Sequence, residues 1–335
     1  MKKSERCKST AALFFILSIV MIAGLILTAF SPTSSIDRVK MKNELSSVYL
    51  NNEVNTVLSQ VVGIETVRSL PYDFSTPQKS PDKSNYFADE NKTGYKDSTI
   101  DVICWKETHK NGAEICFADI TIKHPSQFRR QWSNGDYNSN KYQTPLRIFN
   151  SSKGVIGMSA DFYKFRKYGI IVQYGTVICD SKGVNYDLDV LVVDYNGDFH
   201  IWKDNDLRDH IQKYGADDIM LSFTFGPALI VDGKPYDASV DTKKIYQLGE
   251  PMDSSGRTAI GQLGKLHYLL CTVGNPGSRR PDVVDIMAAK GCITAYNLDG
   301  GQSGTMLFDS KVYNKIAYKG NERPMSDILY FASAE

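Results

Sequence analysis

A short glycine-rich segment carries the residue types in this sequence that could do chemistry. Residues 297–305 read Asn-Leu-Asp-Gly-Gly-Gln-Ser-Gly-Thr and lie between two predicted strands. Glycines let the backbone approach a ligand closely, and successive free N–H groups form a concavity that binds anions. Asp299 adds a carboxylate, Asn297 a neutral amide, and Ser303 and Thr305 add hydroxyl groups. The pattern indicates an anion-binding site beside a carboxylate; a glycine-rich hairpin whose aspartate only caps a turn is the alternative of equal weight.

Common phosphate-binding, nucleophile and metal motifs are absent. The segment lacks the Gly-Lys-Ser/Thr of a P-loop, and Thr305 stands where a Gly-x-Ser-x-Gly elbow has its last glycine. The five histidines are scattered without a His-Glu-x-x-His pair, and no Cys-x-x-Cys pair occurs. The sequence therefore predicts no metal ligand and no cofactor, and it leaves a divalent metal near the carboxylates an open question.

Composition sets broad limits on the class of protein. The 335 residues are 42% hydrophobic, 11% aromatic and 23% charged, which excludes a wholly disordered, collagen-like or many-span membrane chain. Lys and Arg number 39 against 38 Asp and Glu, for a net charge of +1. Since nucleic-acid binding normally needs a basic field, no nucleic-acid partner is expected.

The N-terminus predicts a membrane anchor. Residues 11–30 are twenty residues without a charge, and a helix of that length reaches about 30 Å, the thickness of the hydrocarbon core of a bilayer. Four basic residues within 1–10 favour a cytoplasmic tail, with the C-terminal domain outside a single-pass cell-membrane anchor. A cleaved signal peptide is the weaker alternative because the apolar run is long and a good cleavage site is missing.

Residues 31–98 are expected to form a stalk helix and a linker. Apolar residues recur near helical spacing over 36–62, where the helix either self-associates or serves as a plain spacer. Residues 69–98 are rich in Pro, Ser, Lys, Asp and Asn, which is typical of a linker or a long surface loop. The folded domain is therefore expected over 99–335.

Within that domain, short β-branched runs outnumber helical signals. A hairpin is predicted over 100–122 with its turn at 110–112, and Cys104 and Cys116 either form a disulfide across it or remain buried thiols. Helices are predicted over 126–132, 206–214 and 281–290, and further strands over 155–160, 169–179, 190–194, 228–231, 266–273, 293–298, 305–308 and 327–332. Because strands and helices do not alternate regularly, the expected fold class is a strand-rich, mixed α+β single domain.

The glycine-rich segment also carries a family resemblance. Residues 297–314, NLDGGQSGTMLFDSKVYN, resemble the NLDGGGSSTM motif with a following asparagine that marks the phosphodiester glycosidase family. Five more segments resemble that family in the same order: 115–130, 159–180, 222–234, 256–273 and 322–331. Together they extend the resemblance over roughly residues 100–333, and their order makes it more specific than any one motif.

The resemblance implies hydrolysis of a sugar joined through C1 to a phosphodiester, as in an N-acetylglucosamine-α-1-phosphodiester of a surface polysaccharide or glycoconjugate. A phosphate leaves with little need of a proton, so cations and N–H donors on the developing charge matter more than a strong general acid. Asp299 and then Asp161 are the implied carboxylates for the oxocarbenium-like centre or the water, and Arg257 would contact the phosphate. The implied substrate-binding residues are Asn297, Gly300, Gly301, Ser303, Thr305 and Arg323.

Two positions depart from the family pattern. Ser159 and Ala160 replace Asn-Gly before Asp161, and residues 274–276 replace Asp-Gly-Arg, unless Arg279 or Arg280 substitutes for the lost arginine. These losses support a second hypothesis, a catalytically weakened relative that binds surface glycans or phosphosugars as a scaffold in exopolysaccharide assembly. A purely structural anchored domain is the third. As alternatives to catalysis, Arg257 would be a surface ion-pair partner and Asp161 a turn residue.

Overall fold

The computed structural model describes residues 79–139, 141–161, 169–181, 188–237, 252–316 and 321–335. The expected cytoplasmic tail, membrane anchor and stalk helix lie outside these residues. Among the residues that are described, no helix has the length and apolar character needed to cross a membrane. The chain divides into two compact units, Met1–Tyr72 and Asp73–Glu335, and every element below belongs to the second.

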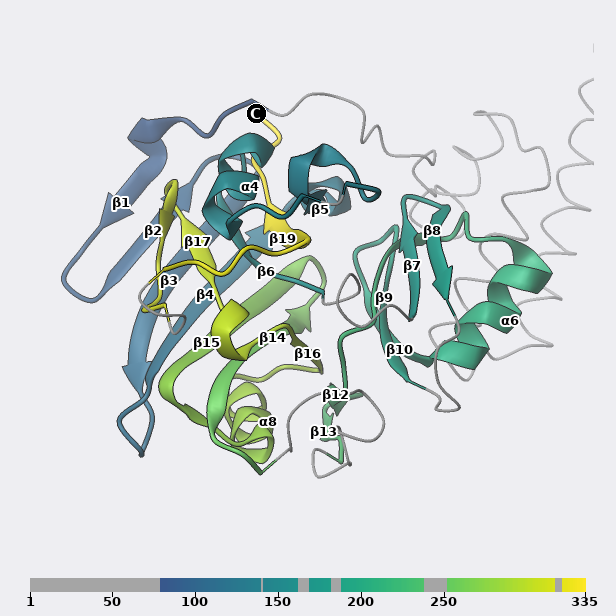
Figure 1. Cartoon of the computed structure of the whole chain (residues 1–335). Helices are drawn as coiled ribbons and strands as arrows, with labels where there is room; N and C mark the ends of the chain where they lie inside the picture. Colours follow the sequence, from purple (N-terminus) through teal and green to yellow (C-terminus); the bar gives the residue numbers. More distant parts are fainter. Residues whose placement is uncertain (1–78, 140, 162–168, 182–187, 238–251, 317–320) are drawn as a thin grey trace, which may run out of the picture. The chain divides into compact units, whose positions relative to one another are not determined.

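A nine-stranded antiparallel sheet forms the centre of this unit (Figure 1). Its strands in spatial order are β1 (Tyr86–Ala88), β2 (Lys92–Lys96), β3 (Ile100–Thr108), β4 (Glu114–Ile122), β15 (His267–Ser278), β14 (Ser255–Gly264), β16 (Thr294–Leu298), β12 (Ala228–Val231) and β13 (Lys234–Pro235). Helix α8 (Arg280–Ala289) covers one face, where Val283, Val284 and Met287 pack among buried apolar residues of the strands. The predicted helix over 281–290 is thus confirmed.

The β3–β4 hairpin forms as predicted, but its register keeps the two cysteines apart. Cys104 pairs with Ala118 and Cys116 with Lys106, so the thiols are diagonal neighbours. Diagonal Cα atoms lie roughly 7–8 Å apart, beyond the usual span of a disulfide. Both cysteines are free and buried, and burial raises the pKa of Cys116 to about 12. Of the two alternatives, the structure therefore has the buried thiols.

Strands β1 and β2 lie within the segment expected to be a linker. They pair with each other and β2 pairs with β3, so the folded sheet begins N-terminal of Thr99. Both strands are short; β1 is largely exposed, and Tyr95 is the one large apolar side chain that β2 buries, which explains the weak apolar signal. The boundary expected at residue 99 therefore needs correction: part of 31–98 belongs to the folded unit.

A five-stranded sheet packs against the other face of the large sheet. Its strands in spatial order are β18 (Lys311–Val312), β17 (Met306–Phe308), β6 (Ile156–Ser159), β19 (Asp327–Phe331) and β5 (Phe128–Trp132), and α4 (Pro145–Ser152) covers its outer side. The interface between the two sheets is aromatic: the Phe128 ring lies 4.6 Å from that of Phe331 and 5.7 Å from that of Tyr268 on β15. This interface is the core that positions the candidate site.

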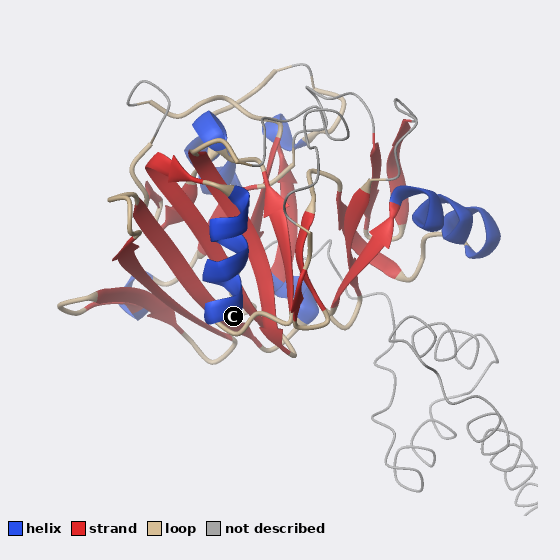
Figure 2. Ribbon diagram, turned by 90° about the horizontal axis from the view of Figure 1, so that it is seen from below, coloured by secondary structure: helices blue, strands red, loops and turns tan. Residues whose placement is uncertain are grey.

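A second five-stranded sheet completes the unit. Its order is β10 (Phe199–Lys203), β9 (Asp189–Asp194), β11 (Ile219–Phe223), β7 (Gly169–Gln173) and β8 (Thr176–Ser181). The α6 helix (Asp204–Tyr214) lies on its outer side, away from the large sheet, and buries Leu207 against it (Figure 1, Figure 2). Short 3₁₀ turns complete the element list: η1 (Lys83–Asn85), η2 (Pro125–Gln127), η3 (Ser133–Gly135) and η4 (Gly301–Ser303).

The strand-rich, mixed α+β class is confirmed, as is the helix over 206–214. The helix predicted over 126–132 is wrong: η2 occupies Pro125–Gln127, and the chain then enters β5. Along β5, Phe128, Arg130 and Trp132 are buried in alternation, the two-residue period of a strand. The buried arginine disguised that period because it reads as a polar position.

Candidate active site

The structure brings Asp161 and Asp299 together at the ends of β6 and β16. The backbone N–H of Asp299 donates to the carbonyl oxygen of Ala160 at 3.0 Å. The Ser159 hydroxyl donates to the carbonyl oxygen of Asp299, also at 3.0 Å. Asp161 is 2% and Asp299 6% exposed, so the chain buries two carboxylates at adjoining strand ends. Burial of neighbouring carboxylates is costly unless donors or cations face them, which makes this junction a candidate active site.

Asp161 is more than a turn residue. Its Oδ2 atom accepts hydrogen bonds from the backbone N–H of Thr224 at 2.8 Å and from the Thr224 hydroxyl at 3.3 Å. The Nη2 atom of Arg130 lies 3.7 Å from the same oxygen, and neither side chain has measurable exposure. Thr224 follows β11, so this carboxylate joins the two five-stranded sheets. Its orientation is therefore fixed by the protein.

Two functional candidates escaped the sequence analysis, Arg130 on β5 and Asp327 at the start of β19. Arg130 Nε lies 3.1 Å from Asp327 Oδ2, and the Asp161 backbone N–H donates to Asp327 Oδ1 at 3.3 Å. Burial raises the pKa of Asp327 to about 8, the Arg130 charge lowering it in part and the charges of Asp161 and Asp299 raising it further. Asp327 therefore holds a proton at neutral pH. The site combines three carboxyl groups with one enclosed guanidinium.

Aromatic rings hold the Arg130 guanidinium in place. Its central carbon lies 4.1 Å from the centroid of Phe223 and 4.9 Å from that of Trp132. Nη2 donates to the carbonyl oxygen of Ser222 at 2.8 Å. Cation–π contacts with desolvated rings stabilise a buried cation that water cannot reach. One signal in the sequence could have indicated Arg130 and Asp327. Each is a charged residue that shares a strand with buried apolar residues.

The glycine-rich segment forms a tight loop over the start of β14. Gly301 has a φ of +57°, which favours glycine, and the Ser303 N–H donates to the Gly300 carbonyl at 2.9 Å. A Cβ atom at Gly300 would lie 2.7 Å from the carbonyl oxygen of Gly256, too close for any side chain. Asn314, the asparagine after the motif, donates from Nδ2 to the Gly304 carbonyl at 2.9 Å. Gly300 thus allows close packing of the loop on the sheet.

Two of the residues expected to bind substrate have side chains that hydrogen-bond to backbone carbonyl groups. Asn297 Nδ2 donates to the Gly226 carbonyl at 2.8 Å, and the Thr305 hydroxyl donates to the Ser303 carbonyl at 3.0 Å; both side chains are buried. Arg323 is half-buried, and its Nη1 donates to the Ser303 hydroxyl at 3.4 Å. Of this set, Arg323 is the cation that the structure places beside the loop.

Arg257 is buried and fastens two backbone segments. Nε donates to the Ser278 carbonyl at 3.0 Å and Nη2 to the Asp253 carbonyl at 2.7 Å, so Arg257 is not a surface ion-pair partner. Burial lowers the pKa of the guanidinium, and the Asp253 charge opposes that shift. Ser255 pairs with Ser278 but Arg257 with Val273, so residues 274–277 bulge out and Arg257 holds the base of the bulge. Within the described part of the chain, its Nη1 has no hydrogen-bond partner.

The bulge occupies the position where Asp-Gly-Arg was expected. Arg279, one of the two candidate substitutes, pairs with Asp282 at the start of α8, with 2.9 Å between Nη2 and Oδ1. Arg280 is 1% exposed. Neither arginine lines the cavity beside the bulge. The described residues include no group of three or more His, Cys, Asp or Glu side chains arranged to hold a metal ion.

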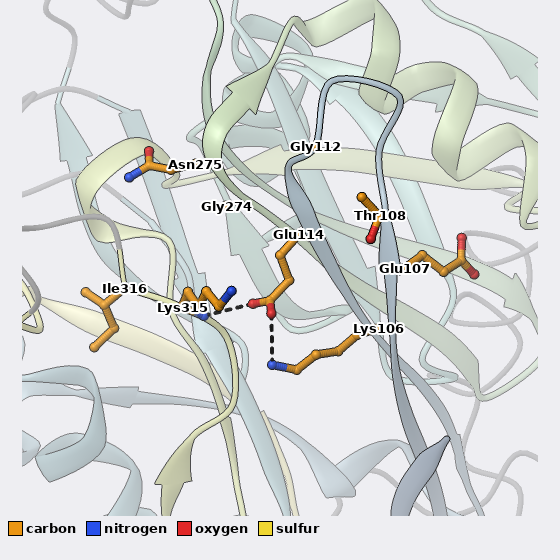
Figure 3. Close-up of a pocket in the computed structure, with 9 residues that line it drawn as sticks. All are labelled: Lys106, Glu107, Thr108, Gly112, Glu114, Gly274, Asn275, Lys315 and Ile316. Carbon is orange, nitrogen blue, oxygen red and sulfur yellow. Dashed lines mark hydrogen bonds and ion pairs between the residues drawn. The ribbon is translucent and has the colours of Figure 1, made fainter. Parts of the chain in front are cut away.

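That cavity measures about 400 Å³ and lies at the edge of the large sheet (Figure 3). Its lining residues are Lys106, Glu107, Thr108, Gly112, Glu114, Gly274, Asn275, Lys315 and Ile316. Register places Leu298, Thr258 and Thr272 opposite one another on β16, β14 and β15. Since neighbouring strands are about 4.8 Å apart, Leu298 at the end of β16 and Thr272 on β15 are separated by roughly 10 Å. The cavity and the glycine-rich loop therefore share one edge of the sheet.

Known structures show this fold. The chain matches the catalytic domain of zebrafish N-acetylglucosamine-1-phosphodiester α-N-acetylglucosaminidase, auto-inhibited by its pro-peptide, with a TM-score of 0.57 and 15% identity over 70% of this chain and 83% of that one. It also matches a hypothetical protein from Synechocystis, with a TM-score of 0.50 and 11% identity over 73% of this chain and 64% of that one. At these identities the matches show the fold alone.

Sequence comparison gives the family. The phosphodiester glycosidase family model matches residues 152–332, more than half of the chain, and the chain belongs to that family. A curated relative, the SPbeta prophage-derived uncharacterized protein YomE of Bacillus subtilis (strain 168), is 24% identical over 191 residues. The match covers 56% of this chain but 29% of the relative's length. The family suggested by the glycine-rich motif is therefore confirmed.

Proposed function

We propose that this chain hydrolyses a sugar linked through C1 to a phosphodiester, at the junction of Asp161, Asp299 and the glycine-rich loop. The observation that supports the proposal is the backbone hydrogen bond from Asp299 to Ala160, which makes Asp299 a neighbour of Asp161 at the start of the glycine-rich loop, with both carboxylates close enough for their charges to raise the pKa of Asp327. Family membership supports the reaction class. The zebrafish structural relative is named for cleaving an N-acetylglucosamine-1-phosphodiester, which suggests that sugar as the first substrate to test.

During the reaction, positive charge develops at C1 of the sugar and negative charge develops on the leaving phosphate. The bond from C1 to the phosphate oxygen breaks with its electron pair moving to the phosphate, while a water oxygen bonds to C1 and loses a proton. The Asp299 carboxylate stabilises the positive charge that develops at C1 or accepts the proton of the water. Asp161, fixed by Thr224 and Arg130, supplies a second negative charge that does not need to reorganise. Asp327 is fully enclosed and acts through these neighbours.

Cations face the phosphate side. Arg323 lies against Ser303 of the loop, and Arg257 has Nη1 available as a donor. Guanidinium groups form paired hydrogen bonds with phosphate oxygens and stabilise charge without giving up a proton. A phosphate is already a good leaving group, whereas the hydroxyl oxygen of a second sugar would need a proton from a general acid to leave. A site that presents cations on this side therefore suits a phosphate better. The geometry thus supports the phosphodiester as the bond that is cleaved.

The cellular setting is part of the proposal. The uncharged run over 11–30 and the basic residues before it support a single-pass anchor in the cell membrane, with residues after 30 outside. An external site would meet surface polysaccharide or glycoconjugate as its substrate, and the segment over 36–62 offers a surface for self-association. A catalytically weakened glycan-binding relative is the second candidate, favoured by the bulge at residues 274–277 in place of Asp-Gly-Arg.

Sugar release from an α-N-acetylglucosamine-1-phosphodiester by the full chain in detergent tests the proposal. Asp299→Asn is expected to abolish release while keeping the fold, since the Asp299 contacts described above use its backbone. Asp309→Asn is the matched control because that carboxylate pairs with Lys83 and Lys311 on the exposed side of the turn. Folded wild-type protein that binds the substrate without releasing sugar would move the glycan-binding candidate to first place.

A further inference from the structure

The cavity at the sheet edge contains a fixed ion pair. Lys106 Nζ lies 3.2 Å from Glu114 Oε2 and 5.0 Å from the centroid of the Tyr313 ring. Glu114 Oε1 accepts the backbone N–H of Lys315 at 3.0 Å, which joins the β3–β4 hairpin to the segment after β18. Figure 3 shows Lys106 and Glu114 pointing toward each other. Lys106 is therefore held in position before any ligand arrives.

The charges around this cavity leave an excess of positive charge. Burial opposes the ionisation of Glu114, but hydrogen bonds from the Lys315 amide and from Lys106 outweigh it and lower its pKa. Figure 3 shows the Glu107 carboxylate pointing away from Glu114, and Glu107 pairs with Lys290. Lys315 is exposed and has no acidic partner among the described residues. The two positive charges of Lys106 and Lys315 exceed the one negative charge of Glu114. One positive charge is therefore left for a ligand to neutralise.

The cavity is also coupled to the proposed reaction centre. Asn314 Nδ2 donates both to the Gly304 carbonyl of the glycine-rich loop, at 2.9 Å, and to the Lys315 carbonyl, at 3.2 Å. One asparagine thus positions the loop and the cavity wall together. From the end of β16, the near wall of the cavity on β15 is roughly 10 Å away and Lys106 on β3 roughly 19 Å away, so an extended ligand that carries several phosphates can reach both places.

We propose that this cavity binds a second phosphate group of a polymeric substrate whose sugars are joined by phosphodiesters. The inference rests on the proposed function, since the first phosphate is the one released beside Asp299. Lys106 keeps two N–H donors free of Glu114, and the Thr108 hydroxyl and the Asn275 amide add neutral donors. Charge-assisted hydrogen bonds of this kind give a lysine cavity its preference for phosphate oxygens. The donors Lys106 and Thr108 precede residues 152–332 and therefore lie outside the family-matched segment.

Two substrates separate this subsite from the reaction centre. One is the single α-N-acetylglucosamine-1-phosphate methyl ester, and the other is an oligomer of the same sugar joined by three phosphodiesters. In full-chain protein, Lys315→Gln is expected to raise KM for the oligomer about fivefold and to leave KM and kcat for the methyl ester unchanged. Lys106→Gln is expected to act in the same direction. Lys311→Gln, a change of an equally exposed lysine on β18, is the matched control and leaves both substrates unaffected.

Equal effects of Lys315→Gln on both substrates, or no effect on either, would overturn the subsite. Failure of wild-type protein to release sugar from either substrate counts against the proposed function, and calorimetric titration with the oligomer then decides the subsite separately. Binding that weakens in Lys315→Gln but not in Lys311→Gln supports the subsite without turnover. Inorganic phosphate that binds as tightly as the oligomer would make the cavity a free-phosphate site and overturn the polymer assignment.

Discussion

The Arg130 guanidinium and the Asp327 carboxyl group meet where solvent does not reach, with 3.1 Å between Nε and Oδ2 on the neighbouring strands β5 and β19. The same guanidinium also lies beside Asp161, with 3.7 Å between Nη2 of Arg130 and Oδ2 of Asp161. One cation therefore serves two carboxyl groups, and the second of these is a candidate for catalysis. The protonated state of Asp327 removes the negative charge that Arg130 could not neutralise. The pair is thus a support for Asp161 as well as a link between strands.

Protonation of Asp327 makes stability depend on pH. Its pKa is about 8 in the folded protein against an ordinary value of 3.8, so the native state keeps a proton that the unfolded chain gives up. The resulting stabilisation is full below about pH 4, decreases as pH rises and is lost above about pH 8, at about 1.4 kcal/mol per pH unit. Asp327→Asn is expected to flatten the decline between pH 5 and pH 8. Urea unfolding at pH 5 and at pH 8 measures the free energy of unfolding of wild type and variant. A decline between the two pH values that is the same in both proteins would contradict a protonated Asp327.

Removal of the Arg130 charge should destabilise the fold strongly. Arg130→Met leaves Asp161 in a buried site without its cation, which typically costs about 3–5 kcal/mol. Arg129→Met on the same strand is the matched control, because Arg129 faces the other way and its Nε donates to the Ser126 carbonyl. Thermal unfolding of both variants tests the difference. Comparable losses would show that Arg130 has no special role.

Gly300 is expected to tolerate no side chain. Gly300→Ala places a Cβ atom 2.7 Å from the Gly256 carbonyl oxygen, so the loop must move away from β14 and carry Ser303 with it. Sugar release should fall at least tenfold, because a displacement of about 1 Å near a reaction centre costs up to a hundredfold in rate. Gly264→Ala at the other end of β14 meets nothing within 4 Å and serves as the control. Full activity of Gly300→Ala would show that the loop is not part of the site.

The cysteines are expected to remain reduced. Cys104 and Cys116 are diagonal across the hairpin, and burial raises the pKa of both thiols, so neither geometry nor reactivity favours a disulfide. A reductant should leave the melting temperature unchanged, and mass spectrometry of the alkylated, denatured protein should count these two as free thiols. A melting temperature that drops with reductant would indicate a cross-link that this register does not allow.

Local patterns predicted the parts of this structure whose signals are local. The proline before and the glycine after α8 marked that helix, and the turn at residues 110–112 marked the hairpin. Strand β5 was misread as a helix because its alternation runs through a buried arginine. Strands β1 and β2 were missed because the exposed edge strand β1 needs few apolar residues and β2 has only Tyr95 as a large buried side chain.

Some residues of the candidate site could be predicted from the sequence, and others could not. The motif suggested Asp299 and the family resemblance Asp161, and the structure places the two together. Arg130 and Asp327 could not be paired from the sequence because their contact depends on β5 and β19 being neighbours, and nothing local specifies a partner so distant along the chain. The hydroxyls and amide of the loop were expected to face substrate, but most face the backbone that they hold. The membrane anchor and the stalk remain predictions.

The order of strands also has a consequence for how the chain reaches its native state. Strand β4 forms a local hairpin with β3, but its other neighbour is β15, and β5 pairs with β19, so the contacts of both strands are completed from the last quarter of the sequence. Contacts between such distant segments make folding slow, and unpaired strand edges invite association with other chains in the meantime. During synthesis, the ribosome delivers β19 almost at the end, and only then can Arg130 meet Asp327. The buried contact between these two side chains therefore forms last, and a chain cut short before β19 would lack both this contact and the Asp327 carboxyl group of the site.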